Sequence, residues 1–586
     1  MDILFINSFN LLNGNSQPEL GQLTLATILS NNGYDTELID FDLIYMENKL
    51  KFYDNLEDNI EAMSNYVLAY NSKIISFYTM CNSYAFALKL AERIKKKSKD
   101  TVIIFAGPHA TATSKDTLKY FPYVDMVARG EGEGYIDSLI HNIINKESLG
   151  NIRGITYRNG GNIIENQGAE VFCNLDSIPP YNDEIIKRYP LNEKFVLDVG
   201  RGCPFNCSFC TTNSFWNRNY RLKSCDHIIS EILHINHNFG VYKFNLNHDM
   251  FTMDRKRVIE FCKKIKELKE DIIWGCSARI DTLDKELIHI MAEAGCERIY
   301  VGIETGSQRM QRIINKNLNL HQALDRLNEI KNTGMGTTIS FIYGFADETE
   351  EDIRDTLKFI AKLYKIGFGE VQLHKLAPYP GTKEFDKVFS KLILLDGYSD
   401  VCELKFFEDF RLMIEKYPSI FSSFYDFSTD VRKKYYGIDV LIRLLTTLFA
   451  SYKWTIRSLI DIYKGDIAEI FIDNRETVLD LMVKMKSITK VGEEYSDTMR
   501  RYFVSALKEI INHSGLLRMD QVKKVIYVFE DDIYRFLHFN EETEMEKRYE
   551  INVIKYIQNR FSIEDGGITV RFLRKDRDHI KVSRIA

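Results

Sequence analysis

Residues 201–210 read Arg-Gly-Cys-Pro-Phe-Asn-Cys-Ser-Phe-Cys and place Cys203, Cys207 and Cys210 at C-x3-C-x2-C spacing. Three thiolates at this spacing can hold three irons of a [4Fe-4S] cube and leave the fourth iron without a protein ligand. At catalytic metals, a substrate or a cofactor binds at such an open position. The glycine and the proline inside the stretch favour an irregular turn that can wrap a cluster. The stretch therefore predicts an iron–sulfur loop that carries chemistry.

Two other interpretations of the motif are a zinc site and incidental clustering among the ten cysteines of the chain. Zinc usually completes its coordination with a nearby fourth Cys or His, and the next candidate, Cys225, lies well beyond the loop. Phe205 and Phe209 place apolar rings beside the thiols, and limited solvent access helps to set the potential of a cluster. The flanks of the motif therefore favour the cluster over zinc.

Length and composition predict a multidomain globular protein. At 586 residues the chain exceeds one hydrophobic core, so we expect three or four domains. Its apolar content of 45% and charged content of 27% are typical of globular proteins. A formal net charge of −6 gives no electrostatic footprint for nucleic acid, and no nucleic-acid partner is expected.

The chain carries no sequence signal for export or membrane insertion. It begins Met-Asp-Ile-Leu-Phe-Ile-Asn, without the basic segment of a signal peptide. No stretch approaches 18 uncharged apolar residues, so we expect no membrane span. Outside the motif the cysteines are scattered, which is typical of a reducing compartment. The sequence therefore predicts a cytoplasmic protein.

Residues 1–145 alternate short apolar runs with helical stretches, a pattern that predicts a doubly wound parallel sheet of Rossmann-like or flavodoxin-like type. Ligands of such sheets bind beyond the carboxyl ends of the strands. The candidate ligand-binding residues at these ends are Ser76, Thr79, Gly107, Pro108, Gly130 and Glu131. The glycines among them allow the close backbone approach that a large planar ligand needs.

Residues 146–195 predict a hairpin followed by a proline-stiffened linker. Over residues 196–390 strand and helix patterns alternate again, which predicts a partial TIM-type (β/α)6 barrel. The predicted strands end at Asp198, Leu246, Ser277, Ile303, Tyr343 and His374. Chemistry in such barrels gathers at the carboxyl ends of the strands, and the cysteine loop follows the first of them.

Together these motifs make residues 1–390 resemble the radical S-adenosylmethionine (SAM) enzymes, in particular the subgroup with an N-terminal cobalamin-binding domain. The N-terminal part of the resemblance rests on Pro18-Glu-Leu-Gly21, Ala106-Gly-Pro-His109 and Gly130-Glu-Gly-Glu133. The resemblance implies that the open iron chelates SAM. It also implies that an electron from the cluster splits SAM to a 5′-deoxyadenosyl radical, which abstracts hydrogen from the substrate.

The N-terminal domain departs from the family pattern in two places. The D-x-H-x-x-G motif, which supplies a lower-axial histidine in other cobalamin enzymes, is absent, and Ala106 replaces the first glycine of G-G-P-H. The resemblance still implies bound cobalamin, without a protein histidine on the cobalt. A domain that keeps this fold and only shields the mouth of the barrel is the alternative.

The resemblance also implies roles for residues of the barrel. Relatives carry paired aspartates near the amino group of SAM; here Asp249 keeps one carboxylate and His248 replaces the other. A helix N-cap is the alternative role for Asp249. Glu304, at a strand end before Thr305-Gly306, can accept the ribose hydroxyls, and the strand that carries Ser340 and Tyr343 would border the adenine.

Two further residues are catalytic candidates. Arg279 resembles a site-facing arginine of the subgroup that can pair a carboxylate bidentately, with a structural ion pair to Asp281 as the alternative. His374 is either an acid–base group or a packed histidine.

The resemblance ends at about residue 390, and residues 391–586 predict a mostly helical domain. The predicted helices span 440–448, 455–463, 498–512 and 522–536, and a short strand spans 568–572. The apolar stretch 441–450 could meet a membrane surface, although such a helix in a bundle is more often core. In related enzymes this region closes the barrel and shapes the substrate pocket, which is the expectation here.

The leading hypothesis is a cobalamin-dependent radical SAM methyltransferase that acts on an unactivated carbon of a small molecule or peptide. One SAM would methylate the cobalamin and a second would yield the radical. The alternative is radical cyclisation, rearrangement, or C–C or C–S bond formation without methyl transfer. A non-enzymatic cluster scaffold is disfavoured because the cysteine triad occurs together with Glu304 and Asp249. The expected partners are the substrate and an electron donor such as flavodoxin or ferredoxin.

Overall fold

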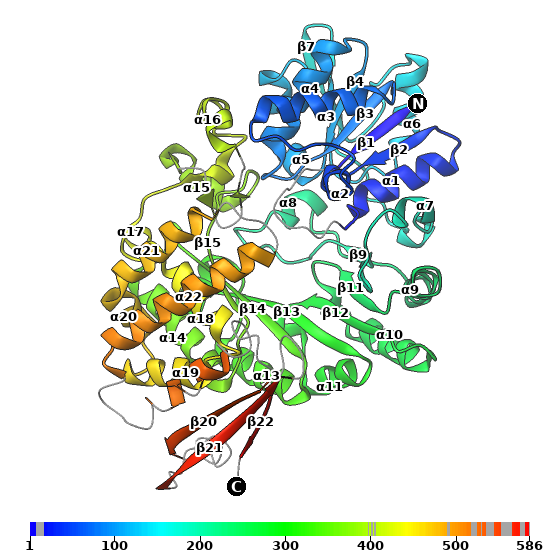
Figure 1. Ribbon diagram of the computed structural model, residues 1–586. Helices are drawn as coiled ribbons and strands as arrows, with labels where there is room; N and C mark the ends of the chain where they lie inside the picture. Colours follow the sequence, from blue (N-terminus) through cyan, green and yellow to red (C-terminus); the bar gives the residue numbers. More distant parts are fainter. Residues whose placement is uncertain are drawn as a thin grey trace.

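A computed structural model describes residues 1–7, 17–395, 398–399, 402–403, 406–488, 493–516, 524, 526–528, 530–534, 544–551, 565–574 and 580–584. Two mainly parallel sheets with flanking helices form an upper N-terminal domain and a barrel below it (Figure 1). Yellow and orange helices of the C-terminal region lie along one side of the barrel (Figure 1). The α/β fold predicted from the sequence is confirmed.

The N-terminal sheet has the strand order β2-β1-β3-β4-β5-β6-β7. Its strands are β1 (Ile3–Ile6), β2 (Thr36–Ile39), β3 (Ile74–Tyr78), β4 (Val102–Ala106), β5 (Met126–Ala128), β6 (Ile155–Asn159) and β7 (Asn162–Glu165). Strands β1 to β5 run parallel, and all four residues of β1 are buried because helices cover both faces. The hairpin expected in the linker forms β6 and β7, which extend this sheet in antiparallel fashion.

The helices of this sheet follow the apolar periodicity of the sequence. They are α1 (Leu20–Asn31), α2 (Phe41–Met46), α3 (Leu56–Leu68), α4 (Tyr84–Lys97), α5 (Pro108–Tyr120) and α6 (Ile136–Asn145). Helix α5 begins with a proline, which is favoured at the first helical position, directly after Gly107. Its N-terminus therefore lies at the carboxyl end of β4, where a ligand of the sheet would bind.

The barrel sheet has the order β15-β14-β13-β12-β11-β8, and all six strands are parallel. Its strands are β8 (Lys194–Asp198), β11 (Lys243–Asn247), β12 (Ile273–Ala278), β13 (Cys296–Glu304), β14 (Gly336–Tyr343) and β15 (Val371–Lys375). Each ends within one residue of its predicted end. The helices between them include α9 (Cys225–Phe239), α10 (Arg255–Glu267), α11 (Lys285–Glu293), α12 (Gln308–Ile313), α13 (Leu320–Thr333) and α14 (Glu350–Ile366).

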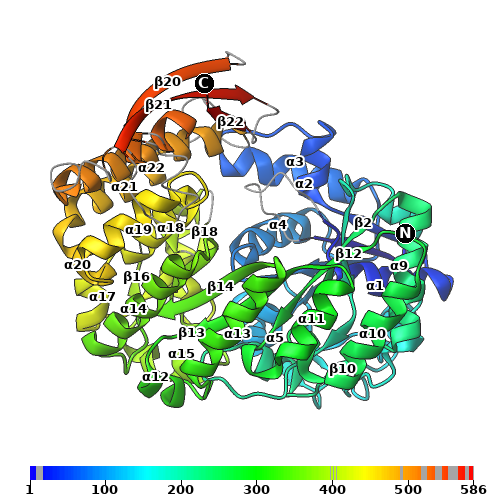
Figure 2. The same ribbon diagram turned by 90° about the horizontal axis from the view of Figure 1, so that it is seen from below.

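The barrel is open between β8 and β15, and C-terminal helices pack beside β15. The region comprises α16 (Phe407–Lys416), α17 (Asp430–Lys434), α18 (Ile438–Leu448), α19 (Lys453–Ile462), α20 (Ile467–Asp473), α21 (Arg475–Lys486) and α22 (Glu493–His513). The Thr446 hydroxyl of α18 donates to the Val371 carbonyl of β15 at 2.6 Å. Seen from below, α18 and its neighbours flank the β14 side of the barrel (Figure 2).

Two parts of the C-terminal region pack on different domains. Phe407, Phe410 and Ile414 of α16 join the core of the N-terminal domain. In contrast, Leu441 and Leu445 of α18 are fully buried in the core that includes the barrel, so the apolar stretch predicted for a membrane surface or a core is core.

The C-terminal strand prediction is confirmed, since β21 (Asp565–Arg574) pairs with β20 (Glu544–Ile551) and β22 (Ile580–Arg584). The predicted helix 522–536 lies partly outside the described residues. Among those that are described, no helix is long and apolar enough to cross a membrane.

Candidate functional site

A cavity of about 590 Å³ lies between the two sheets, at the carboxyl ends of strands from both. The N-terminal domain contributes Ser76, Gly107, Pro108, Gly130 and Glu131 to its lining, and the barrel contributes Asp198, Arg201, Thr212, Trp216, His248 and Asp249. Seven of the predicted site residues therefore line one space. Thr79 does not line it; its hydroxyl and its amide both donate to the Ala106 carbonyl, at 2.8 and 2.9 Å, and tie β3 to β4.

The three cysteines occupy the loop between β9 (Gly200–Arg201) and α8 (Thr212–Trp216), and all three are free, half-buried thiols. Gly202 begins the loop with a φ of +81°, and a Cβ there would collide with the Asn219 carbonyl. The loop is fixed further because Ser208 N–H donates to the Ile314 carbonyl at 3.0 Å. The motif therefore adopts the irregular turn that its sequence predicts.

The thiols lie near one another without meeting at one point. Burial raises the pKa of Cys203 to about 11, and the neighbouring Cys210 and Cys207 raise it as well. In the described part of the chain, no three Cys, His, Asp or Glu side chains converge on a single metal ion. A cube of four irons needs no such convergence, because each cysteine binds a different iron. The donor set fits a cluster better than a mononuclear zinc site.

Asp249 and His248 directly follow β11, and their side chains make different contacts. The Asp249 carboxylate accepts from the Thr212 hydroxyl at 3.1 Å, and burial raises its pKa. The helix N-cap at α10 is Asp254, not Asp249. Both ring nitrogens of His248 are used, since Nδ1 accepts from Met250 N–H at 2.7 Å and Nε2 lies 3.2 Å from the Arg221 carbonyl. Burial lowers the pKa of His248 to about 4, so the ring is neutral.

Glu304 ends β13 in a strained conformation. Its φ is +68°, which is rare for a side chain of this type, and a bulge precedes it in the pairing with β14. The buried carboxylate accepts from Lys316 Nζ at 2.8 Å. Strain of this kind persists where the surrounding structure fixes it and is frequent at ligand sites.

Lys316 is a residue that the sequence did not single out. Burial raises the pKa of the Cys207 thiol, and the charges of Lys316 and Arg279 oppose that shift. Lys316 therefore lies between the predicted ribose acceptor and the cysteine loop. Lys316 follows α12 in a turn in which Asn315 and Asn317 have positive φ. In the sequence, the two asparagines that flank Lys316 indicate such a turn.

Arg279 is buried beside the cysteine loop. Its Nε and Nη2 donate to the two carboxylate oxygens of Asp281 at 2.8 and 2.9 Å, and Nη1 lies 4.0 Å from Cys207 Sγ. The guanidinium also stacks over the Phe205 ring at 3.9 Å and donates to the Lys316 carbonyl. The ion pair between Arg279 and Asp281 that the sequence offered as the alternative therefore forms. The same guanidinium also places a positive charge next to Cys207.

The other predicted residues of the barrel lie on different faces. Ser340 pairs with Gln372, and Ile342 pairs with His374, in parallel register. Because residues two apart on a strand point to the same side of the sheet, Ser340 and His374 share the inner face of the barrel. The Tyr343 side chain points outward, where its hydroxyl donates to Asp439 of α18 at 2.7 Å. Phe209 packs edge-on against Phe345 at 5.9 Å between ring centroids.

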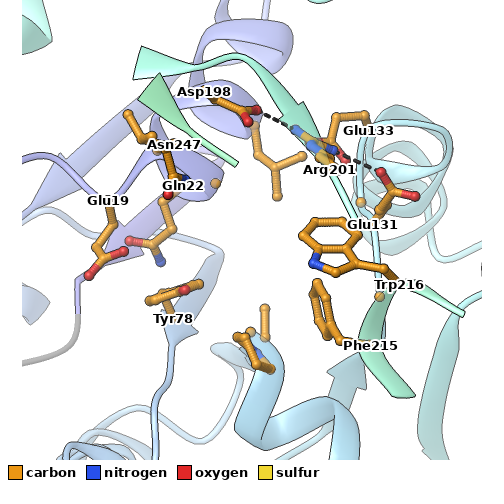
Figure 3. A pocket seen from close by; sticks show the side chains of 18 of the residues that line it. Glu19, Gln22, Tyr78, Glu131, Glu133, Asp198, Arg201, Phe215, Trp216 and Asn247 are labelled. Atoms are coloured by element: carbon orange, nitrogen blue, oxygen red, sulfur yellow. Dashed lines mark hydrogen bonds and ion pairs between the residues drawn. The ribbon is translucent and has the colours of Figure 1, made fainter. Parts of the chain in front are cut away.

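A buried ion-pair network joins the two domains at the edge of the cavity. Arg201 contacts Glu131 at 3.0 Å, Glu133 at 2.7 Å and Asp198 at 3.2 Å. Arg221 contacts Glu131 at 2.8 Å, and the Trp216 ring lies beneath both guanidinium groups. Because Arg201 directly precedes the cysteine loop, this network fixes the loop relative to the N-terminal domain (Figure 3).

Polar groups of the N-terminal domain face the cavity from the opposite side. Gln22 donates through Nε2 to the Ile6 carbonyl at 3.0 Å, and its Oε1 is buried without a partner among the described residues. Burial raises the pKa of Glu19 to about 7, so its carboxyl can donate as well as accept. An unpaired acceptor and a protonatable carboxyl suit a ligand rimmed with amides, such as the corrin ring that the sequence resemblance implies. The described residues therefore fit cobalamin.

Comparisons with known proteins agree with this geometry. Residues 197–360 match the radical SAM superfamily, and residues 13–140 match the B12 binding domain. An uncharacterized methyltransferase of Pyrococcus horikoshii is 28% identical over 390 residues, which cover 65% of this chain and 81% of that protein. The anaerobic magnesium-protoporphyrin IX monomethyl ester cyclase of Cereibacter sphaeroides is 30% identical over 267 residues, 44% of each chain.

Among solved structures, the cobalamin-dependent SAM radical enzyme OxsB, determined with aqua-cobalamin and SAM, superposes with a TM-score of 0.58. The alignment covers 92% of this chain and 80% of OxsB at 16% identity. It therefore shows a shared fold that extends into the C-terminal region.

Proposed function

Since the chain is a radical SAM enzyme of the subgroup with an N-terminal cobalamin-binding domain, we propose that it methylates an unactivated carbon of a small molecule or peptide. The observation that supports this proposal is the shared cavity of about 590 Å³. The N-terminal sheet and the helix that follows the cysteine loop border the same space, so a cofactor on the sheet faces the loop directly. The naming of the Pyrococcus relative as a methyltransferase agrees with this function.

When bound, the cluster with SAM supplies the radical and cobalamin supplies the methyl group. Cys203, Cys207 and Cys210 are proposed to hold the cluster, with Arg279 and Lys316 adding positive charge near Cys207. Positive charge next to a thiolate favours its deprotonated, metal-binding form.

Other residues are proposed to hold SAM. Glu304 would accept the ribose hydroxyls, and Asp249 the amino group, because both are carboxylates beside the cysteine loop. The polar inner face around Ser340 would contact the adenine end. His248, neutral and bonded at both nitrogens, orients the segment that carries Asp249 rather than moving a proton.

The N-terminal residues are proposed to cradle the corrin. Gly107 has a φ of +100°, and a Cβ there would lie 2.7 Å from the Thr79 carbonyl, so backbone rather than side chain meets a ligand at this point. Phe215 and Trp216 face Tyr78 across the cavity (Figure 3). These rings would exclude water from the space between the two cofactors.

The proposal is tested by the products formed from SAM. Anaerobic protein carrying cluster and cobalamin, supplied with SAM, a one-electron reductant of the flavodoxin or ferredoxin type and a pool of small molecules and peptides as the source of substrate, is expected to form S-adenosylhomocysteine together with 5′-deoxyadenosine. Replacement of any motif cysteine by Ala is expected to abolish 5′-deoxyadenosine. The control is Cys173→Ala, an exposed thiol outside the site, which is expected to leave both products unchanged.

A second candidate is radical bond formation without methyl transfer, which the naming of the Cereibacter relative as a cyclase favours. It predicts 5′-deoxyadenosine without S-adenosylhomocysteine in the same assay. Absence of both products would refute both functions.

A further inference from the structure

A second cavity, of about 380 Å³, lies between the barrel edge and the C-terminal helices and shares no residue with the first. Strand β15 contributes Gln372 and His374, helix α18 contributes Asp439 and Arg443, and α21 contributes Met485. The volume is in the range of small-molecule sites. This space lies where the sixth strand of the barrel leaves its edge open to the C-terminal region.

The cationic group of the cavity is available to a ligand. Arg443 is exposed, whereas Leu441, Ile442, Leu444 and Leu445 around it are fully buried and hold α18 in place. Within the part of the chain that the structure describes, the Arg443 guanidinium forms no hydrogen bond and no ion pair. Helix α18 thus presents a planar guanidinium group whose N–H donors have no partner among the described residues. The arrangement of these donors matches the geometry of a carboxylate or a phosphate.

The rest of the lining combines a neutral ring, one carboxylate and apolar side chains. Burial lowers the pKa of His374, so this ring is a neutral hydrogen-bonding partner. The Asp439 carboxylate also lines the cavity and accepts from the Tyr343 hydroxyl at 2.7 Å. Val440 and Met485 add apolar wall.

The cavity lies close to the strands that carry the proposed SAM site. The charges of Asp439 and Glu304 both act on His374. Glu304 ends β13, two strands from β15, and neighbouring strands lie about 4.8 Å apart, which puts the two strands about 10 Å apart. His374 of the cavity therefore lies on a strand about two strand spacings from the one that carries the proposed ribose acceptor.

We propose that this cavity is the substrate subsite for an anionic group, a carboxylate or a phosphate, which Arg443 holds while the reacting carbon points into the barrel. The inference rests on the proposed function, since it assigns the class of substrate. It also explains why the C-terminal helices pack on β15: they complete the substrate site.

The test uses full-length protein with two probes, inorganic phosphate and acetate, titrated separately and followed by 31P and 13C NMR line broadening. Wild-type protein is expected to bind at least one probe, and the preferred probe distinguishes phosphate from carboxylate. Arg443→Gln is expected to weaken that binding at least tenfold. Arg475→Gln, an exposed arginine of α21 outside the cavity, is the matched control and is expected to bind as the wild type does.

A second variant keeps the test informative if Arg443→Gln does not fold. Gln372→Glu is nearly isosteric and exposed, and it places a negative charge inside the cavity, so it is expected to abolish binding. Binding that survives in both variants, or no binding to the wild type at tens of millimolar probe, would overturn the proposal. Failure of the proposed function shows differently, because absence of S-adenosylhomocysteine leaves the anion titration unaffected.

Discussion

The interdomain network around Arg201 gives the sharpest stability prediction. Arg201 is 6% exposed and bonds three carboxylates of two domains at 2.7 to 3.2 Å. In Arg201→Met, Glu131 keeps Arg221, whereas Glu133 and Asp198 lose their ion pair in a buried place. Removal of one partner from a buried ion pair costs about 3–5 kcal/mol. We therefore expect a loss of about 3–5 kcal/mol in the free energy of unfolding.

The assay is urea unfolding of the anaerobic full chain, followed by tryptophan fluorescence, since Trp216 lies beneath the two guanidinium groups. The matched control is Arg153→Met, which removes an exposed ion pair with Glu170 at 2.7 Å. Exposed pairs contribute less than about 1 kcal/mol. A loss in Arg201→Met no larger than that in Arg153→Met would refute the role of the network.

Three further predictions concern the site. Gly202→Ala is expected to lower the iron content of the reconstituted protein severely, because Gly202 has a φ of +81° and an added Cβ would collide with the Asn219 carbonyl. The control is Gly240→Ala, since Gly240 has a φ of +67° and open space around it. Equal iron content in the two variants would contradict the reasoning. Glu304→Ala is expected to weaken SAM binding at least tenfold in equilibrium dialysis, since one hydrogen bond to a charged group contributes about 1.5–3 kcal/mol. An unchanged affinity for SAM would assign Glu304 a structural role instead. Burial lowers the pKa of His248 to about 4, so the folded state stays neutral while the unfolded chain gains a proton below pH about 6.5. Stability is therefore expected to fall as pH drops from about 6.5 towards 4, by about 2 kcal/mol at pH 5, and His248→Gln should flatten this dependence in urea titrations at pH 5 and 7; an equal slope in the variant would exclude His248 as its source.

The elements of this fold were predictable because each has a local signature. The four apolar residues of β1 and the periodicity of α18 are visible in the sequence, and both elements form where expected. The cysteine loop was equally predictable, since Gly202 and the three thiols lie within one short segment, residues 202–210.

Contacts between distant segments were not predictable. Helical periodicity shows that one face of α18 is buried, but not that the helix packs along β15 and turns Arg443 into a cavity. Likewise, Lys316 pairs with Glu304 only because a helix and a turn fold back on β13. Glu131 looked like a ligand residue, and the structure shows that it also bonds two arginines of the barrel.

The measurement that tests the central claim most directly is anaerobic purification of the full chain from cobalamin-supplied cells, with iron assayed chemically and cobalamin read by ultraviolet–visible absorbance. The account predicts four irons and one cobalamin per chain, and loss of cobalamin binding when residues 1–145 are removed. A cluster without cobalamin would contradict methyl transfer and would leave the N-terminal domain as a cover for the barrel.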